Sequence, residues 1–183
     1  MAAALIDDFA PTGDVLELAC GPGTSARHLI RHASTLTLVD GSARMLARAR
    51  ETINGPNVTF IEADIFDWEP DRRYDAVFFS AWLSHVPPAR FEDPWTLVRR
   101  SLGPDGRVAF LDEDDRGAMN DEVSIVDGIP IAPRMLADGT TFDIVKVFWK
   151  PTELERRLDD LGWAISVRPV DEGYLFGSGT TRC

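Results

Sequence analysis

Three acidic residues in the first part of the sequence stand where they could hold one polar ligand. Glu17, Asp40 and Asp64 each lie within or shortly after a short apolar run. Carboxylates accept hydrogen bonds from hydroxyl, amine and ammonium groups. If the three runs are neighbouring parallel strands, their acids meet at one edge of a sheet, where such sheets bind ligands. The three runs are residues 15–20, 36–39 and 58–61.

Two glycines follow the first apolar run. Gly21 and Gly23 let the backbone turn sharply and approach a ligand closely. Residues 21–26 also satisfy the G-x-G-x-x-G/A pattern of dinucleotide-binding proteins, and Asp40 follows at the spacing typical of an acid that binds a ribose. The pattern therefore leaves two cofactors in competition, a nicotinamide dinucleotide and S-adenosylmethionine.

The charge of Glu17 separates these two cofactors. A carboxylate beside the glycine turn would repel a diphosphate, because two unit charges about 4 Å apart interact by roughly 4 kcal/mol at an effective dielectric constant of about 20. S-adenosylmethionine has no phosphate, and an acid attracts its sulfonium and ammonium groups while backbone amides face its carboxylate. Glu17 therefore favours S-adenosylmethionine.

The other two acids suit the nucleoside part of that cofactor. Asp40 can accept hydrogen bonds from both ribose hydroxyls, and Gly41 leaves room for the sugar. Asp64 can accept a hydrogen bond from the exocyclic amine of adenine, and Ile65 can cover the ring. Both acids also have simpler interpretations. Asp40 could cap a helix, although Ser42 can do so instead, and Asp64 could form a turn.

A histidine after the fourth apolar run is the candidate catalytic base. Imidazole groups ordinarily titrate near neutral pH, which suits His85 to removing a proton from an acceptor. Its alternative role is to pack and to support its loop through a backbone hydrogen bond. Trp82 suits either a pocket wall or the core, and Arg134 suits either a substrate contact or the solvated surface.

Apolar runs and helix signals alternate along the chain. Residues 24–32 predict the first helix, and Ser42 predicts the cap of the second. Asp93 as a cap, with Pro94 in the first helical position, predicts a later helix. A further helix follows Thr152 and Glu155, which form a capping box. The predicted parallel strands are residues 15–20, 36–39, 58–61, 76–79 and 108–111.

This alternation implies an α/β fold with a doubly wound, Rossmann-like, mostly parallel sheet, because right-handed crossovers place helices on both faces. Residues 163–170 and 174–176 predict a C-terminal antiparallel hairpin. Residues 112–141 are acidic and rich in turn residues, so we expect an irregular insertion that serves as a substrate lid. Strand character returns at residues 142–149. We expect residues 1–183 to form one domain.

The composition excludes several kinds of partner. The chain has 30 acidic and 19 basic residues and a formal net charge of −11, so nucleic acids and anionic membranes meet like charge. Its longest uncharged stretch, residues 76–89, is too short and too polar to span a bilayer. The N-terminus lacks the basic lead of a secretory signal, so we expect a cytoplasmic protein. Cys20 and Cys183 form no metal-ligand cluster, and no metal is expected.

The sequence resembles the class I S-adenosylmethionine-dependent methyltransferases over nearly its whole length. The resemblance rests on VLELACGPG at residues 15–23, VDGS at 39–42, ADI at 63–65, YDAVFF at 74–79 and LGPDG at 102–106. It implies that residues 80–85 line the site of methyl transfer. The cofactor residues that it implies are Glu17, Ala19, Cys20, Gly21, Gly23, Asp40, Gly41, Met45, Asp64, Ile65 and Ser80. Ala19 stands where the family often has its first glycine.

We therefore expect methyl transfer from S-adenosylmethionine to an O, N or S nucleophile of a small molecule. His85 would act as the base for an alcohol or phenol, whereas a thiolate or carboxylate would need none. The alternatives are an NAD(P)-dependent oxidoreductase and a non-catalytic protein that binds S-adenosylmethionine. Either the insertion or a second subunit, in a homodimer, is expected to close the site.

Overall fold

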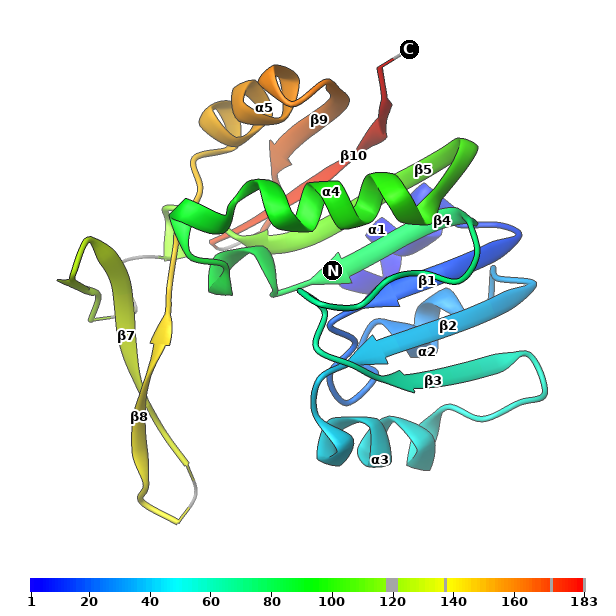
Figure 1. Ribbon diagram of the computed structural model, residues 1–183, viewed down its shortest axis with the longest axis horizontal. Coiled ribbons are helices and arrows are strands. Elements are labelled where there is room, and N and C mark those ends of the chain that lie inside the picture. The colour runs from blue at the N-terminus through cyan, green and yellow to red at the C-terminus, as the bar shows by residue number, and fades with distance from the viewer. Residues whose placement is uncertain (118–121, 137, 172, 183) are drawn as a thin grey trace.

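Seven strands form the main sheet, in the order β3-β2-β1-β4-β5-β10-β9 (Figure 1). The computed structural model describes residues 1–117, 122–136, 138–171 and 173–182. Strands β1 to β5 are parallel, and β10 runs antiparallel to both β5 and β9. The predicted doubly wound sheet with a C-terminal antiparallel hairpin is confirmed. The strands are β1 (Asp14–Leu18), β2 (Thr35–Asp40), β3 (Val58–Glu62), β4 (Tyr74–Ser80), β5 (Leu102–Glu113), β9 (Trp163–Pro169) and β10 (Tyr174–Thr181).

Helices cover both faces of this sheet because successive strand residues point to opposite faces. In β4, Ala76 and Phe78 belong to one core, whereas Val77 and Phe79 belong to the other. The first core includes residues of α1 (Ala2–Phe9), α2 (Ala26–Leu29) and α3 (Ala43–Thr52). The second includes residues of α4 (Glu92–Ser101) and α5 (Pro151–Asp160). An apolar parallel strand requires such cover on both sides.

The first two crossovers confirm one helix signal and shorten another. The side chain of Ser42 caps α3, since its Oγ accepts the N–H of Met45 at 3.4 Å. The helix predicted at residues 24–32 is reduced to Ala26–Leu29. Residues 24 and 25 belong to the turn after β1, and residues 30–32 form a turn at the other end of the helix.

Two predicted helix caps are wrong. Helix α4 begins at Glu92, and the carboxylate of Asp93 accepts from the side chain of Arg90 at 2.7 Å instead of capping the helix. Helix α5 begins at Pro151 without a side-chain cap, and the Glu155 carboxylate instead accepts the N–H of Val167 at 2.8 Å. Among the described residues, no helix is both long and apolar enough to cross a membrane.

The connection between β3 and β4, residues 63–73, has no helix, which corrects the expected strand–helix alternation. Phe66 and Trp68 of this connection pack against the core where a crossover helix would lie. After β4 the chain forms two short 3-10 helices, η1 (Leu83–His85) and η2 (Pro88–Arg90), before α4.

The predicted irregular insertion instead contains a small antiparallel sheet, which we call the arm. The arm consists of β6 (Ser124–Val126), β7 (Ile129–Met135) and β8 (Thr141–Val145), and it projects from the main sheet (Figure 1). Asp127 and Gly128, with φ of 51° and 79°, join β6 to β7. An Asp-Gly pair favours such two-residue hairpin turns. Strand β8 ends at Val145, so it covers only the first part of the strand predicted at residues 142–149. Parts of the predicted insertion (118–121 and 137), of the hairpin turn (172) and Cys183 lie outside the described residues.

Candidate functional site

The strand order reverses between β1 and β4, and predicted site residues lie at the carboxyl ends of the strands there. Strands β2 and β3 lie on the far side of β1, and β5 lies beyond β4. Open α/β sheets bind ligands at this point, because the connections on the two sides turn away from each other and leave a crevice. Asp40 and Ser80 are the last residues of β2 and β4, and Glu17 is the last but one of β1.

Glu17 is a buried acid with an unsatisfied oxygen. Glu17 is 1% exposed, and its Oε2 has no hydrogen-bond partner among the described residues. Burial raises the pKa of Glu17 well above its usual range, and the negative charge of Asp40 raises it further. A buried polar atom without a partner destabilises the fold unless a ligand supplies one. The position of Glu17 therefore fits a ligand that brings a cationic hydrogen-bond donor.

Asp40 holds the turns that follow both β1 and β2. Its Oδ2 accepts the N–H of Gly21 at 2.8 Å, and its Oδ1 accepts the N–H of Ser42 at 2.8 Å. A carboxylate oxygen has two lone pairs, so each oxygen can also accept from a ribose hydroxyl. Gly41 is exposed beside it, as the prediction of room for a sugar requires.

The turn after β1 contains three left-handed residues. The φ angles are 51° for Ala19, 54° for Gly21 and 82° for Gly23. A Cβ atom on Gly21 would meet nothing within 4 Å, whereas one on Gly23 would lie 2.3 Å from the side chain of Ile53. Gly21 thus borders open space, while Gly23 is required by the packing of α3. The left-handed φ of Ala19 explains why glycine suits this position.

The amides of this turn are used within the protein. The N–H of Gly21 binds Asp40, and the N–H of Gly23 binds the carbonyl of Cys20 at 3.0 Å. A diphosphate on a glycine turn needs such amides as donors. The geometry therefore disfavours a dinucleotide, and it also means that these two amides do not face a cofactor carboxylate as predicted.

The remaining predicted residues around the turn have ordinary packing. The thiol of Cys20 is buried, and burial together with the neighbouring carboxylates raises its pKa. The hydroxyls of Ser80 and Ser25 are 3.1 Å apart and join the end of β4 to the start of α2. Met45 is half-buried in the first turn of α3. These residues surround the turn, and their contact with a cofactor stays a prediction.

The two residues predicted to contact adenine, Asp64 and Ile65, follow β3. Asp64 is exposed, and its Oδ1 accepts the N–H of Phe66 at 3.0 Å, which is the turn-forming role noted as its simpler interpretation. Ile65 is 8% exposed and belongs to the same core as Trp82. The carboxylate of Asp64 is accessible to a ligand, but its contact with adenine stays a prediction.

His85 joins the loop after β4 to the arm. Its Nδ1 lies 2.8 Å from the carbonyl oxygen of Val145, at the end of β8. A carbonyl oxygen can only accept, so Nδ1 carries the proton and Nε2 is the acceptor in the neutral ring. The supporting role that the sequence offered for His85 is thus present, and the ring keeps one nitrogen able to take a proton.

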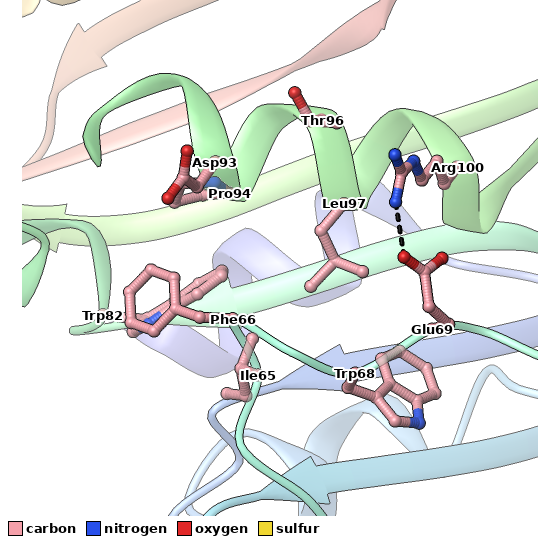
Figure 2. Close-up of a pocket in the computed structure, with 10 residues that line it drawn as sticks. All are labelled: Ile65, Phe66, Trp68, Glu69, Trp82, Asp93, Pro94, Thr96, Leu97 and Arg100. Carbon is pink, nitrogen blue, oxygen red and sulfur yellow. Dashed lines mark hydrogen bonds and ion pairs between the residues drawn. The ribbon is translucent and has the colours of Figure 1, made fainter.

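Trp82 is both a core residue and a pocket wall. It is 8% exposed, and its ring lies 5.3 Å from that of Phe79, edge to face. It also lines a cavity of about 300 Å³ between α4 and the β3–β4 connection (Figure 2). Leu97 points into this space from α4, and a 2.5 Å ion pair between Glu69 and Arg100 crosses its other end. The described lining residues are Ile65, Phe66, Trp68, Glu69, Trp82, Asp93, Pro94, Thr96, Leu97 and Arg100.

Two buried charged residues lie near His85, and sequence reasoning missed the first of them. Lys146 is 1% exposed, and its Nζ lies 2.7 Å from the carboxylate of Glu113 at the end of β5. Asp112 is fully buried, although the acidic run at residues 112–115 is typical of a solvated loop. No local signal marks Lys146, whereas the place of Asp112 at the end of a predicted strand allows it to face the site. The predicted Arg134 lies on β7 opposite Phe142, three residues further along the arm than Val145.

Comparison with known proteins agrees with this geometry. A family model described as a methyltransferase domain matches residues 15–106. A solved complex of DhpI with SAH is 42% identical in sequence, with a TM-score of 0.83, over 99% of this chain and 84% of that chain. A complex of DhpI with SAM and HEP is 44% identical, with a TM-score of 0.84, over 97% and 84%.

A curated relative is similar over a shorter stretch. The trans-aconitate 2-methyltransferase of Escherichia coli O139:H28 is 39% identical over 75 residues, which are 40% of this chain and 29% of that protein. The match therefore spans less than a third of the length of this relative.

Proposed function

The chain belongs to the class I methyltransferase family, and from this premise we propose that it transfers the methyl group of S-adenosylmethionine to an oxygen nucleophile of a small anionic molecule. The observation that carries the cofactor part is the unsatisfied Oε2 of the buried Glu17 beside the glycine turn. An ammonium group supplies the donor that this oxygen lacks, and a dinucleotide would bring a diphosphate to an acid.

Three groups of residues would hold the cofactor. Glu17 would bind its ammonium group, the carboxylate of Asp40 its ribose hydroxyls, and Asp64 with Ile65 its adenine. When bound, the cofactor supplies an electrophilic methyl group on sulfur, with a neutral thioether as the leaving group. Much of the remaining catalysis is positioning, since holding a nucleophile about 3 to 3.5 Å from the methyl group and in line with it removes most of the entropic barrier.

His85 would take the proton of a hydroxyl acceptor on Nε2. The hydrogen bond from Nδ1 to Val145 keeps the ring in the tautomer whose Nε2 has a free lone pair. The same hydrogen bond would stabilise the positive charge of the protonated ring, because the carbonyl oxygen of Val145 accepts from Nδ1–H. A carboxylate acceptor has no proton to lose, so His85 would only donate a hydrogen bond to it or pack against it.

The buried Lys146 supports an anionic acceptor. Glu113 takes one of the three N–H donors of the ammonium group, and the other two can bind an acid from the substrate. Lys146 follows Val145 directly, so it lies where the arm meets the loop that carries His85. The relative from Escherichia coli is named for trans-aconitate, which is itself a carboxylic acid, and this is consistent with such a substrate class.

The arm is the proposed substrate lid, because it is bound to the loop after β4 through His85. The proposal also includes a cytoplasmic location, which the free, buried thiol of Cys20 supports, since reducing compartments preserve thiols.

A turnover assay with four acceptor sets tests the proposal. Small carboxylic acids, hydroxy acids, amines and thiols are incubated with the protein and S-adenosylmethionine, and S-adenosylhomocysteine is measured by mass spectrometry. We expect turnover with acids or hydroxy acids. Turnover with amines or thiols alone would contradict the acceptor class.

Calorimetric titration with each cofactor tests the premise separately. Tight binding of NAD(H) without a response to S-adenosylmethionine would reject methyl transfer altogether. Binding of S-adenosylmethionine without product from any acceptor would favour a non-catalytic binding protein.

A further inference from the structure

The carboxylate of Asp112 binds four backbone N–H groups. Its Oδ2 accepts from Trp82 at 2.9 Å and from Leu83 at 2.8 Å. Its Oδ1 accepts from Ser84 at 3.3 Å and from Glu113 at 2.9 Å. Three of these donors are consecutive residues at the start of η1, about 30 residues away in the sequence. One side chain of β5 thus holds the whole turn that follows β4.

This carboxylate is saturated by the protein. Asp112 is 0% exposed, and burial raises its pKa while the hydrogen bonds that it accepts from Ser84, Glu113 and Leu83 oppose that rise. Two carboxylate oxygens offer about four lone-pair sites, and four N–H groups fill them. Asp112 therefore has no capacity left to bind a substrate or to accept its proton, and any role in the reaction must act through the turn that it holds.

The turn held by Asp112 carries His85 and attaches the arm. Beyond the bond from His85 to Val145, the carbonyl of Ser84 accepts the N–H of Val147 at 2.8 Å. The turn begins with a left-handed residue, Ala81, whose φ is 49°. Such a conformation persists only where surrounding contacts impose it. The N–H of Ala81 binds the carbonyl of Leu111 at 2.9 Å, and the Asp112 carboxylate binds the N–H of the next residue, Trp82.

We propose that Asp112 is a positioning residue for methyl transfer: by binding the N–H groups of residues 82–84, it sets the place of His85 and the attachment of the arm. This inference rests on the proposed function for its effect on turnover. The hydrogen bonds themselves make a second, independent prediction about the protection of the backbone.

The chain offers a matched control for loss of a buried carboxylate. Asp114 lies two residues further along and is also 0% exposed. Its carboxylate accepts from the backbone and side chain of Arg116, at 2.9 and 2.8 Å, and not from the turn after β4. Asp112→Asn and Asp114→Asn thus remove the same charge from neighbouring positions with different partners.

The experiment compares the two variants in turnover and in cofactor binding. We expect Asp112→Asn to lower kcat about tenfold or more while Asp114→Asn stays within about twofold, with the dissociation constant of S-adenosylmethionine within about twofold in both. If Asp112 acts through His85, then in a His85→Ala background Asp112→Asn lowers kcat by less than about twofold further. Equal kcat in the two single variants would overturn the inference, and an additive effect with His85→Ala would overturn the part of it that acts through His85.

Hydrogen exchange tests the same inference without turnover. We expect the amides of residues 82–84 to exchange about tenfold faster or more in Asp112→Asn and at the wild-type rate in Asp114→Asn. Unchanged protection in Asp112→Asn would overturn the inference. A wild-type protein without turnover would refute the proposed function, and the exchange result would then decide whether Asp112 positions the turn. If Asp112→Asn yields no folded protein, Asp112→Ser, whose small side chain admits water to the donors, is judged by the same criteria.

Discussion

The Nδ1 atom of His85 lies 2.8 Å from the carbonyl oxygen of Val145, 60 residues later in the chain. This contact fixes the tautomer of the ring and ties the arm to the loop at the end of β4. The proposed role of His85 as a base and its contact with the arm predict different results on substitution.

His85→Ala should lower kcat for a hydroxyl acceptor by about 100-fold or more, the usual contribution of a general base. For a carboxylate acceptor, which has no proton to lose, the decrease should be much smaller. Steady-state kinetics with the two acceptors measure the difference, and His28→Ala, at a half-buried position of α2, is the control. Normal kcat with a lower melting temperature would assign His85 to packing alone.

Asp40→Ala should weaken binding of S-adenosylmethionine by about 1 to 3 kcal/mol, because the ribose hydroxyls and the N–H of Gly21 both lose an acceptor. Calorimetric titration measures the change. Asp67→Ala removes an exposed carboxylate from the β3–β4 connection and should leave the affinity unchanged. An Asp40→Ala protein with wild-type affinity would contradict the ribose assignment.

Glu17 should couple cofactor binding to pH. Its pKa is raised in the folded protein, so the folded state keeps a proton that the unfolded chain loses above about 4.5. Because the folded state then binds more protons, this group's contribution to stability decreases as pH rises from about 4.5 towards the folded pKa. A bound cation favours the ionised carboxylate, so binding should release the proton, and affinity should increase with pH over the same window.

Calorimetry in two buffers with different ionisation enthalpies measures this proton release. Glu17→Gln cannot ionise, so its binding enthalpy should not depend on the buffer. The same proton release in wild type and Glu17→Gln would show that another group titrates.

Lys146→Met should raise KM for an anionic acceptor about tenfold or more, since it removes the buried cation and keeps an unbranched side chain. The affinity for S-adenosylmethionine should stay the same. Lys150→Met, at the exposed start of α5, is the matched control. A KM equal to that of the control would remove the basis for an anionic substrate.

Gly21→Ala and Gly23→Ala should separate binding from stability. Both variants place alanine at a left-handed φ, which destabilises the fold by about 1 to 2 kcal/mol in each case. The new methyl group of Gly23→Ala would also lie 2.3 Å from Ile53, so this variant should melt at the lower temperature. The methyl group of Gly21→Ala enters open space, where a cofactor would lie, so it should mainly weaken cofactor binding. Thermal melts and titrations measure both, and equal melting temperatures would contradict the packing argument.

The strand–turn–helix order of the first half of the chain could be predicted from the sequence because its signals are local. Apolar runs of four to six residues, the glycines at 21 and 23, and the Ser42 cap act over a few positions, and the structure confirms them. The Asp-Gly pair at 127 and 128 is an equally local signal of the β6–β7 hairpin, and it was overlooked among the other turn residues of the insertion.

Only the tertiary structure decided which polar groups are buried and what they bind. Glu155 has the spacing of a capping box, but packing of α5 on β9 brings it to Val167 instead. Asp112 reads as part of a solvated acidic run, but the end of β5 carries it under the turn after β4. The sequence by itself placed the acids at strand ends. Folding determined that Oε2 of Glu17 has no hydrogen-bond partner in the described part of the chain and that the Asp112 carboxylate has four. Burial and hydrogen bonds between distant residues depend on how whole elements pack, and no spacing along the chain encodes them.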